Sequence, residues 1–253
     1  MNYWVKRAEL APKAKEHTKL MQEKYSDEIA QCISQSVIYG KEAKKPVATF
    51  MDKVAEQILL KDTTVGALFK VPALYEKVAL LNFASYNNAG GKFIEGSSAQ
   101  EESLCHSSFL YNVLSGMPEF YEWNNAHKNK ALYMDRAIYS PNVVFIDGDE
   151  VRKADVITCA APNRSVLEKY GSFTEEENFD ALSNRIYFVR DICMDNHVDV
   201  AILGAWGCGV FRQEPSIVAN LLKETFAPTG IKVIYAVPDE KTYSAFQVVI
   251  GKN

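Results

Sequence analysis

The chain has 253 residues, of which 47% are apolar, and its formal net charge at pH 7 is −4. This length and apolar fraction suit a globular protein with a buried core and exclude a disordered or fibrous chain. The mild negative charge argues against general nucleic-acid binding, which needs a basic surface, although a pocket for a single nucleotide does not.

Five scattered cysteines bear on the cellular location. They are odd in number, without close pairs and mostly within apolar runs: Cys32, Cys105, Cys159, Cys193 and Cys208. This pattern predicts reduced, buried thiols rather than disulfides. The first 12 residues lack the apolar core of a signal peptide, and no apolar run reaches membrane-spanning length. We therefore expect a soluble, cytoplasmic protein that works as a monomer and does not bind membranes.

Residues 1–70 are expected to form a mainly helical extension packed on a core of residues 71–253, the two being one structural unit. Residues 9–24 are rich in Lys, Glu, Leu and Ala and predict an exposed helix. A short apolar run at 35–39 predicts a strand. Apolar residues then recur at three- and four-residue steps, which predicts an amphipathic helix over 47–59.

The middle of the chain predicts a buried strand and a helix joined by a loop of small residues. Residues 78–83 form a compact apolar run, which is typical of a strand covered on both faces. Beyond the loop, apolar residues recur with helical spacing as far as Gly116. We expect one helix that begins near Gln100 and is capped by Ser97 or Ser98.

The second half of the chain alternates strands and helices. Further strands are expected at 143–146, 156–160, 198–203, 233–237 and 246–250. Thr174 and Glu177 have the spacing of a capping box, so a helix should follow them. A second glycine-rich loop, residues 204–211, precedes a helix that begins near Pro215.

Buried strands that alternate with amphipathic helices indicate a single α/β domain, with a largely parallel or mixed central sheet between helical layers. In such folds ligands collect at the carboxyl ends of strands, where both glycine-rich loops fall. Glycines allow consecutive backbone N–H groups to converge on phosphate oxygens. Neither loop carries the Walker A pattern, and no GxGxxG follows the first strand, which argues against an ATPase or an ordinary dehydrogenase.

Two acids follow the first loop directly. Glu101 and Glu102 come after Gln100 at the expected start of the helix. Adjacent helical residues diverge by about 100°, so we expect the two carboxylates to point in different directions. One should face the reacting centre, while the other is held by its surroundings or contacts a neighbouring hydroxyl. A carboxyl group beside an anion-binding loop suits acid–base catalysis.

Four stretches carry a family resemblance. They are residues 82–93, with Asn88, Gly90-Gly91 and Phe93; the triplet Gln100-Glu101-Glu102; and residues 204–211, with Ala160-Ala161-Pro162-Asn163 between them. Together they resemble the bacterial-type (microbial) poly(ADP-ribose) glycohydrolases, whose catalytic domain is a macrodomain. The resemblance implies a macrodomain-like three-layer α/β/α domain with a mixed central sheet and an N-terminal helical extension. It also implies exo-type hydrolysis of the ribose–ribose O-glycosidic bond, which releases ADP-ribose without a cofactor or a metal ion.

The resemblance further implies roles for the matching residues. Glu102 would protonate the leaving oxygen and then activate water, while Glu101 would anchor a ribose hydroxyl. The substrate-binding residues would be Gln100, Asn88, Gly90, Gly91, Lys92, Phe93, Gly207, Cys208, Gly209, Val210 and Phe211. Among them, the glycines would hold the diphosphate from two sides, Asn88 would bind the distal ribose and Phe211 the proximal one. The expected ligands are ADP-ribose and poly(ADP-ribose), free or attached to a protein.

One residue departs from the family pattern. The family's loop reads Pro-Gly-Gly-Gly, whereas this chain has Lys92 in place of the third glycine. If that position needs a positive φ, lysine is strained there; if the backbone touches phosphate, the side chain obstructs the contact or adds a charge. Two alternatives therefore stay open: a mono-ADP-ribosyl hydrolase that acts on protein or nucleic acid, and a non-catalytic ADP-ribose-binding module.

Several other polar residues are expected to be structural. His106, one turn after Glu102, predicts a partly buried histidine, and Trp206 a packing residue. The acids at 147–150 predict a solvated turn rather than a cation site, and Asp239 a turn residue.

Overall fold

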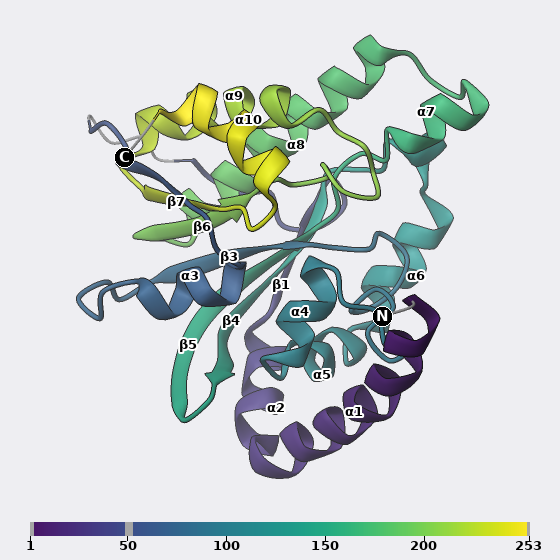
Figure 1. The fold of residues 1–253 in the computed structure, drawn as a ribbon, viewed down its shortest axis with the longest axis vertical. Helices are drawn as coiled ribbons and strands as arrows, with labels where there is room; N and C mark the ends of the chain where they lie inside the picture. Colours follow the sequence, from purple (N-terminus) through teal and green to yellow (C-terminus); the bar gives the residue numbers. More distant parts are fainter. Residues whose placement is uncertain (1–2, 49–52, 252–253) are drawn as a thin grey trace.

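The computed structural model describes residues 3–48 and 53–251, which form seven strands and ten α-helices (Figure 1). The strands are β1 Val37–Gly40, β2 Gln57–Leu60, β3 Val78–Phe83, β4 Arg136–Asp147, β5 Glu150–Cys159, β6 Val200–Gly204 and β7 Lys232–Ala236. The helices are α1 Tyr3–Lys24, α2 Ser26–Gln35, α3 Thr64–Lys70, α4 Gln100–His106, α5 Leu110–Ser115, α6 Pro118–Ala126, α7 Ser165–Tyr170, α8 Glu175–Asp195, α9 Pro215–Phe226 and α10 Glu240–Ile250. Two 3-10 turns, Asn129–Ala131 and Ala227–Thr229, complete the described elements. No helix in these two stretches is both long and apolar enough to cross a membrane.

The strands form one mixed sheet in the order β1-β4-β5-β3-β6-β7-β2. β5, β3, β6, β7 and β2 run parallel, whereas β4 is antiparallel to both of its neighbours. The prediction of a mixed central sheet is confirmed. Both edge strands come from the first 70 residues, which are therefore part of the sheet as well as of the helical layers.

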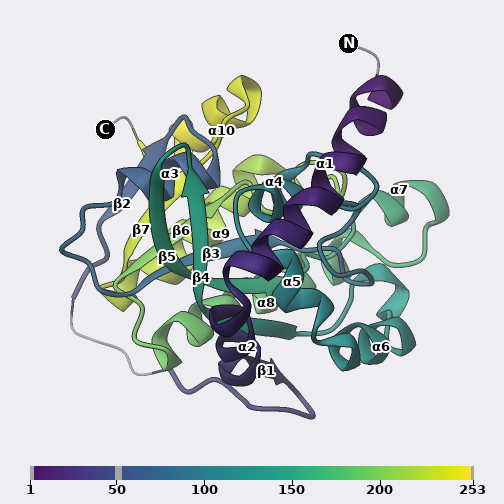
Figure 2. The ribbon, with the colours of Figure 1, turned by 90° about the horizontal axis from the view of Figure 1, so that it is seen from below.

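Helices cover both faces of the sheet, as Figures 1 and 2 show. Because side chains alternate along a strand, Val78 and Leu80 of β3 pack against the layer of α1 to α5, whereas Ala79 and Leu81 pack against α8, α9 and α10. The three-layer α/β/α architecture is confirmed. The capping box of α8 is also confirmed, with Thr174 accepting from the N–H of Glu177 at 3.1 Å.

Two predicted elements are wrong. Residues 57–60 form the edge strand β2, not the end of a helix, and Val54 before it is 81% exposed; Phe50 and Met51 of the predicted helix lie outside the described residues. The run 246–250 ends helix α10 and is not a strand. Both runs are short and apolar, so their periodicity does not distinguish helix from strand, and the neighbouring elements decide.

The helix expected after the first loop is two helices. α4 ends at His106 and α5 begins at Leu110. The interruption is stabilised by Ser108, whose hydroxyl donates to Leu104 O (2.7 Å) and accepts from the N–H of Leu110 (3.1 Å). The predicted serine cap is wrong as well, because the N-cap of α4 is Ala99, which makes no side-chain cap.

Helix α1 packs directly on the loop that precedes α4. Arg7 donates to the carboxylate of Glu95 (2.5 Å). Gly96, with φ +82°, lies so close to α1 that a Cβ would be 2.2 Å from Arg7 O and 2.7 Å from Ala11 N. The N-terminal helix therefore holds one end of the loop by backbone contact.

We expect Gly96→Ala to lower the free energy of unfolding by about 3 kcal/mol, because it adds backbone strain and an overlap with the α1 backbone. Gly148→Ala is the matched control, since Gly148 has φ +58° and nothing within 4 Å of its Cβ position. The control should cost only the strain, about 1 kcal/mol. Urea unfolding of both variants tests this, and equal losses would show that the contact with α1 contributes nothing.

Candidate active site

Both glycine-rich loops leave the same edge of the sheet. β3 and β6 are parallel neighbours, with Ala79 opposite Ala201. The segment after β3 (residues 84–99, loop 1) and the segment after β6 (residues 205–214, loop 2) therefore begin side by side. The fold thus brings together two segments that are far apart in the sequence, at the edge where α/β sheets bind ligands.

Loop 1 is a succession of tight turns that glycine makes possible. The N–H of Gly91 donates to Asn88 O (3.1 Å), and that of Phe93 donates to Gly90 O (3.0 Å). Gly90 and Gly91 have φ of +61° and +60°, a region that L side chains rarely adopt. Lys92 is not among the residues with positive φ. A lysine at this position therefore carries no backbone strain of that kind.

The carboxylates of Glu101 and Glu102 flank the same glycine. A Cβ placed on Gly91 would lie 2.7 Å from Glu102 Oε1 and 2.9 Å from Glu101 Oε2. The expectation that the two carboxylates point in different directions is wrong. The helix separates the two Cα–Cβ bonds, but a glutamate side chain has several rotatable bonds, and both chains bend toward loop 1.

Glu101 is enclosed and fully hydrogen-bonded. Its side chain is 3% exposed. Oε1 accepts from Asn82 Nδ2 (3.2 Å), and Oε2 accepts from the N–H of Ser85 (2.7 Å). Burial raises the pKa of Glu101 to about 8, although the two hydrogen bonds act in the opposite direction and lower this pKa. Glu101 is therefore a neutral acid at pH 7.

We expect Glu101 to make the protein less stable as the pH rises. Its folded pKa lies above the ordinary value of 4.5, so the folded state holds a proton that the unfolded chain releases. The stabilisation is complete below pH 4.5 and is lost as the pH rises to about 8. Within this window, each pH unit should lower the free energy of unfolding of the wild type by about 1.4 kcal/mol more than that of Glu101→Gln. Urea unfolding from pH 5 to 8 measures the difference, and parallel profiles would contradict the raised pKa.

Glu102 differs from its neighbour in having an accessible oxygen. It is 6% exposed, and Oε1 accepts from the N–H of Lys92 at 3.0 Å. Oε2 accepts no hydrogen bond from the described residues, and it is not among the fully buried atoms without a partner. Oε2 is therefore the carboxyl oxygen of this pair that the described protein leaves without a hydrogen-bond partner.

Gln100 joins three elements and has no spare polar atom. Its Oε1 accepts from the N–H of Phe83 (2.8 Å), and its Nε2 donates to Leu81 O (2.9 Å) and Thr64 Oγ1 (3.1 Å). The start of α4 is thereby tied to the end of β3 and to α3. This arrangement supports the loop, while the substrate contact that the resemblance implies for Gln100 stays a prediction.

Loop 2 is closed by Gln213. Its N–H donates to Gly207 O (3.0 Å), and its Nε2 donates to Pro162 O (2.9 Å). Gly207 has φ +77°, and a Cβ there would lie 2.9 Å from both Ala161 and Gln213. A Cβ on Gly209 would meet nothing within 4 Å. The loop is thus packed behind Gly207 and open at Gly209.

Two titratable groups near the loops are neutral at pH 7. Burial raises the pKa of the Cys208 thiol to about 12, which argues against a thiolate nucleophile. Burial lowers the pKa of His106, which packs edge-on against Phe93 at 4.7 Å. Among residues 3–48 and 53–251, no group of three or more His, Cys, Asp or Glu is placed to hold a metal ion.

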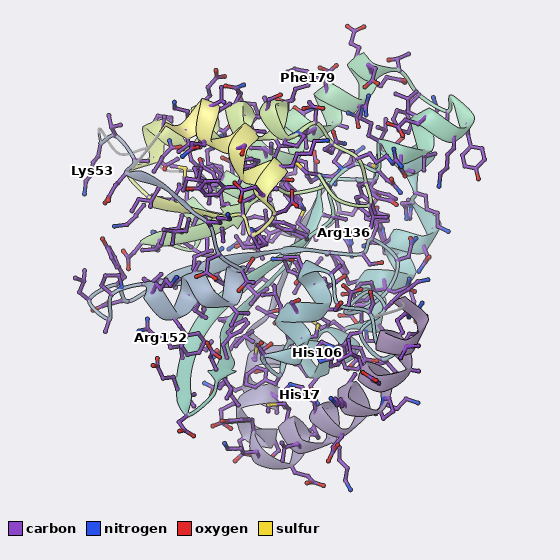
Figure 3. The ribbon with its side chains drawn as sticks, in the orientation of Figure 1. His17, Lys53, His106, Arg136, Arg152 and Phe179 are labelled. Atoms are coloured by element: carbon purple, nitrogen blue, oxygen red, sulfur yellow. The ribbon has the colours of Figure 1, made fainter. Side chains whose placement is uncertain are left out.

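Three predicted substrate-binding residues lie in different environments. Phe93 is fully buried and packs between the rings of His17 and His106, which Figure 3 labels. The ring therefore supports loop 1 from within the core, and the contact of Phe93 with substrate stays a prediction. Asn88 is exposed on loop 1, and Val210 is 81% exposed on loop 2.

Phe211 belongs to an aromatic cluster that the sequence did not indicate. Its ring lies 6.1 Å from that of Tyr133, which stacks on Tyr86 at 4.2 Å. These residues come from loop 2, from the segment before β4 and from loop 1. Trp206, as expected, is a packing residue and is 1% exposed. The cluster thus links the two loops through the buried rings of Tyr86 and Tyr133 and the partly buried ring of Phe211.

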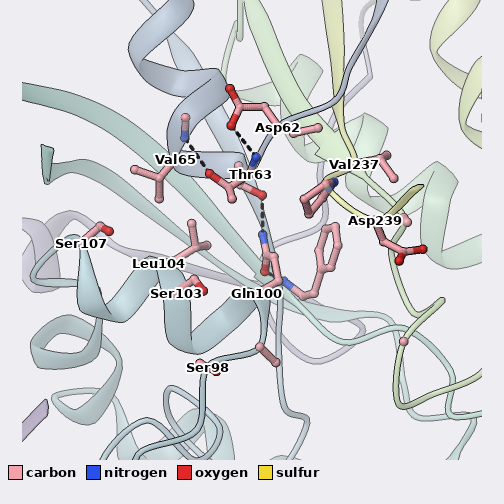
Figure 4. Close-up of a pocket in the computed structure, with 18 of the residues that line it drawn as sticks. Asp62, Thr63, Val65, Ser98, Gln100, Ser103, Leu104, Ser107, Val237 and Asp239 are labelled. Atoms are coloured by element: carbon pink, nitrogen blue, oxygen red, sulfur yellow. Dashed lines mark hydrogen bonds between the residues drawn. The ribbon is translucent and has the colours of Figure 1, made fainter. Parts of the chain in front are cut away.

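A cavity of about 990 Å³ lies between α3 and α4 and reaches the loops after β6 and β7 (Figure 4). Gln100 lines it from α4, and Cys208 and Gly209 line it from loop 2. Glu101 and Glu102 do not line it. The cavity therefore adjoins the two acids through Gln100 and the glycine-rich loops rather than enclosing them.

The β2–α3 connection is the wall of this cavity that sequence reasoning missed. Asp62 accepts from the N–H of Thr63 (2.7 Å), and Thr63 caps α3 by accepting from the N–H of Gly66 (3.0 Å). Asp239 lies opposite, as the N-cap of α10. The sequence Asp62-Thr63-Thr64 is typical of a helix N-terminus. Because a helix was predicted over 47–59, a new helix so soon after it was not expected.

The comparisons with known proteins agree with this geometry. The profile of the family described as "Microbial-type PARG, catalytic domain" matches residues 7–147. Poly(ADP-ribose) glycohydrolase from Thermomonospora curvata has a similar structure, with 28% identity and a TM-score of 0.83, over 95% of this chain and 99% of that one. The same enzyme in complex with the inhibitor ADP-HPD matches with 27% identity and a TM-score of 0.81, over the same shares of the two chains. Poly(ADP-ribose) glycohydrolase from Deinococcus radiodurans in complex with ADP-ribose matches with 27% identity and a TM-score of 0.75, over 87% of this chain and 96% of that one. No curated protein sequence matches the chain.

Proposed function

The chain belongs to the family of microbial-type poly(ADP-ribose) glycohydrolase (PARG) catalytic domains, and from that premise we propose that it hydrolyses poly(ADP-ribose) as a glycosidase. It cleaves the ribose–ribose O-glycosidic bond at the end of the polymer and releases ADP-ribose. The observation that carries this assignment is the pair of acids at Gly91, of which only Glu102 has an accessible carboxyl oxygen.

The reaction needs one acid that also serves as a base. Glu102 gives its proton to the leaving oxygen as the bond from C1″ to that oxygen breaks, and the ribose passes through an oxocarbenium-like state. The Glu102 carboxylate then takes a proton from water as the water oxygen bonds to C1″, which restores the acid. The neighbouring Glu101 is neutral below about pH 8, so it does not add a second negative charge beside Glu102.

The two loops provide the binding site for the ADP-ribose unit. Gly90 and Gly91 offer backbone on one side of the diphosphate, and residues 207–210 on the other. Asn88 and Phe211 are assigned to the distal and proximal riboses. The cavity between α3 and α4 has the volume of a nucleotide site and begins beside both loops. We therefore assign the adenosine half of ADP-ribose to this cavity.

Incubation of the purified protein with labelled poly(ADP-ribose) tests this function. Free ADP-ribose should accumulate from the start of the reaction, because cleavage occurs at chain ends. Early appearance of oligomers would contradict end cleavage, and absence of any product would overturn the function itself.

The non-catalytic alternative depends on strain at Lys92 or on obstruction of a phosphate contact by its side chain. Because Lys92 has no positive φ and its N–H holds Glu102, the lysine is compatible with a working acid. A mono-ADP-ribosyl hydrolase remains an alternative that the same assay addresses, with mono-modified protein as a second substrate.

We also infer a cytoplasmic location. All five cysteines are unpaired, and four of them are buried. Thiols of this kind suit a reducing compartment. Fractionation of the native host, with a disulfide-bonded secreted protein as the control, tests the location, and light scattering tests the expected monomer.

A further inference from the structure

Lys92 is the only cationic residue of loop 1, and the one cation of loop 2, Arg212, is paired with Glu168 at 3.4 Å. The Lys92 side chain is exposed and makes no ion pair with the described residues. The acid of the same loop, Glu95, is already paired with Arg7. The ammonium of Lys92 is therefore a positive charge without a described protein partner at the mouth of the candidate site.

The position of this charge relative to the reacting bond follows from the backbone. The amide nitrogen of Lys92 lies 3.0 Å from Glu102 Oε1. A lysine side chain in any rotamer keeps its ammonium within roughly 10 Å of that carboxylate, which is about one Debye length at physiological salt. Lys92 can therefore act on a charged group near the bond that Glu102 protonates.

The substrate has two diphosphates near this bond. One belongs to the ADP-ribose unit that is released, and the proposed function assigns it to the backbone of the two loops. The other belongs to the leaving unit, whose ribose 2′-oxygen is the leaving oxygen and whose own diphosphate is attached a few bonds away. The other cation of the two loops, Arg212, is already paired with Glu168, so Lys92 is the cation of these loops that is left for the second diphosphate.

We propose that Lys92 binds the diphosphate of the leaving unit and is a specificity-determining residue for polymer over conjugates with a phosphate-free leaving group. This inference rests on the proposed function. It predicts that the effect of Lys92 depends on what is attached to the leaving oxygen, and not on the ADP-ribose unit that is released.

Two substrates with the same scissile bond separate these effects. In one, ADP-ribose is joined through C1″ to the 2′-oxygen of a second ADP-ribose; in the other, it is joined to the 2′-oxygen of adenosine. Lys92→Gln should lower kcat/KM about fivefold for the first and leave the second within about twofold, whereas Lys92→Arg should retain both. The salt dependence of kcat/KM for the first substrate should also weaken in Lys92→Gln. Lys169→Gln, which changes an exposed lysine of α7 without an ion pair, is the control.

An equal fall on both substrates would overturn the inference, because Lys92 would then act on the released unit or on Glu102. Unchanged rates on both would overturn it as well. If the wild type cleaves neither substrate, the proposed function fails, and the inference fails with it. Thermal unfolding of each variant should match the wild type, since the hydrogen bonds of Lys92 within the described protein are made by its backbone N–H and C=O.

Discussion

Glu102→Gln should lower kcat for release of ADP-ribose by about 10³-fold, equivalent to about 4 kcal/mol of transition-state stabilisation. The amide cannot give a proton to the leaving oxygen or take one from water. It can still accept the hydrogen bond from Lys92 N–H that holds the side chain at 3.0 Å. We therefore expect the fold and the affinity for ADP-ribose to be unchanged.

Steady-state kinetics on poly(ADP-ribose) and calorimetry with ADP-ribose measure the two parts of this prediction. Glu122→Gln is a suitable control, because Glu122 is an exposed glutamate of α6. The assignment of the acid would be wrong if Glu102→Gln kept more than about a tenth of the wild-type kcat. Loss of ADP-ribose binding together with kcat would instead point to a role in holding the ligand.

Gly91→Ala should have the second-largest effect, and it should act on catalysis more than on stability. A Cβ would lie 2.7 Å and 2.9 Å from the carboxylates of Glu102 and Glu101. Both contacts are with the ends of flexible side chains, which can move aside at little cost to the fold. Displacing a catalytic group by about 1 Å costs roughly 10²-fold in rate, so we expect a loss of at least that size in kcat.

The loss of stability in Gly91→Ala should be about 1 kcal/mol, from the φ of +60° alone. Gly171→Ala provides the matched control, because Gly171 has φ +59° and no atom within 4 Å of its Cβ position. The control should lose the same stability and keep full activity. If Gly91→Ala remained fully active, the close approach of Gly91 to the two acids would have no catalytic importance.

The wrong predictions share a physical cause. β2 and the end of α10 are short apolar runs, in which periods of two and of nearly four residues cannot be distinguished. β2 is a strand because it pairs with β7, with Gln57 opposite Val233. Residues 246–250 are helical because Asp239 caps α10, and because Phe246 is buried against the α8–α9 layer. Partners far away in the sequence decided both elements.

The candidate active site, like the fold, was only partly predictable from the sequence. The glycines of loop 1, the triplet that begins with Gln100 and the second glycine-rich loop were all recognisable in the sequence. The convergence of Glu101 and Glu102 on Gly91 was not, because helical geometry predicts that adjacent residues diverge. The burial of Phe93 was not recognisable either, since it depends on the packing of α1 and α4 around its ring.

The order of amino acids by itself determined the buried strands, the loops at their carboxyl ends and the family, because apolar runs, glycines and the Gln-Glu-Glu triplet are local patterns. Only the tertiary structure showed how the surroundings of the two acids differ. Glu101 and Glu102 are adjacent and chemically identical, yet Asn82 and Ser85 occupy both oxygens of the first. Lys92 occupies only one oxygen of the second. Burial and hydrogen bonding depend on segments that folding brings together, so the resemblance could imply different roles for the two acids, but no local pattern could give the physical difference between them.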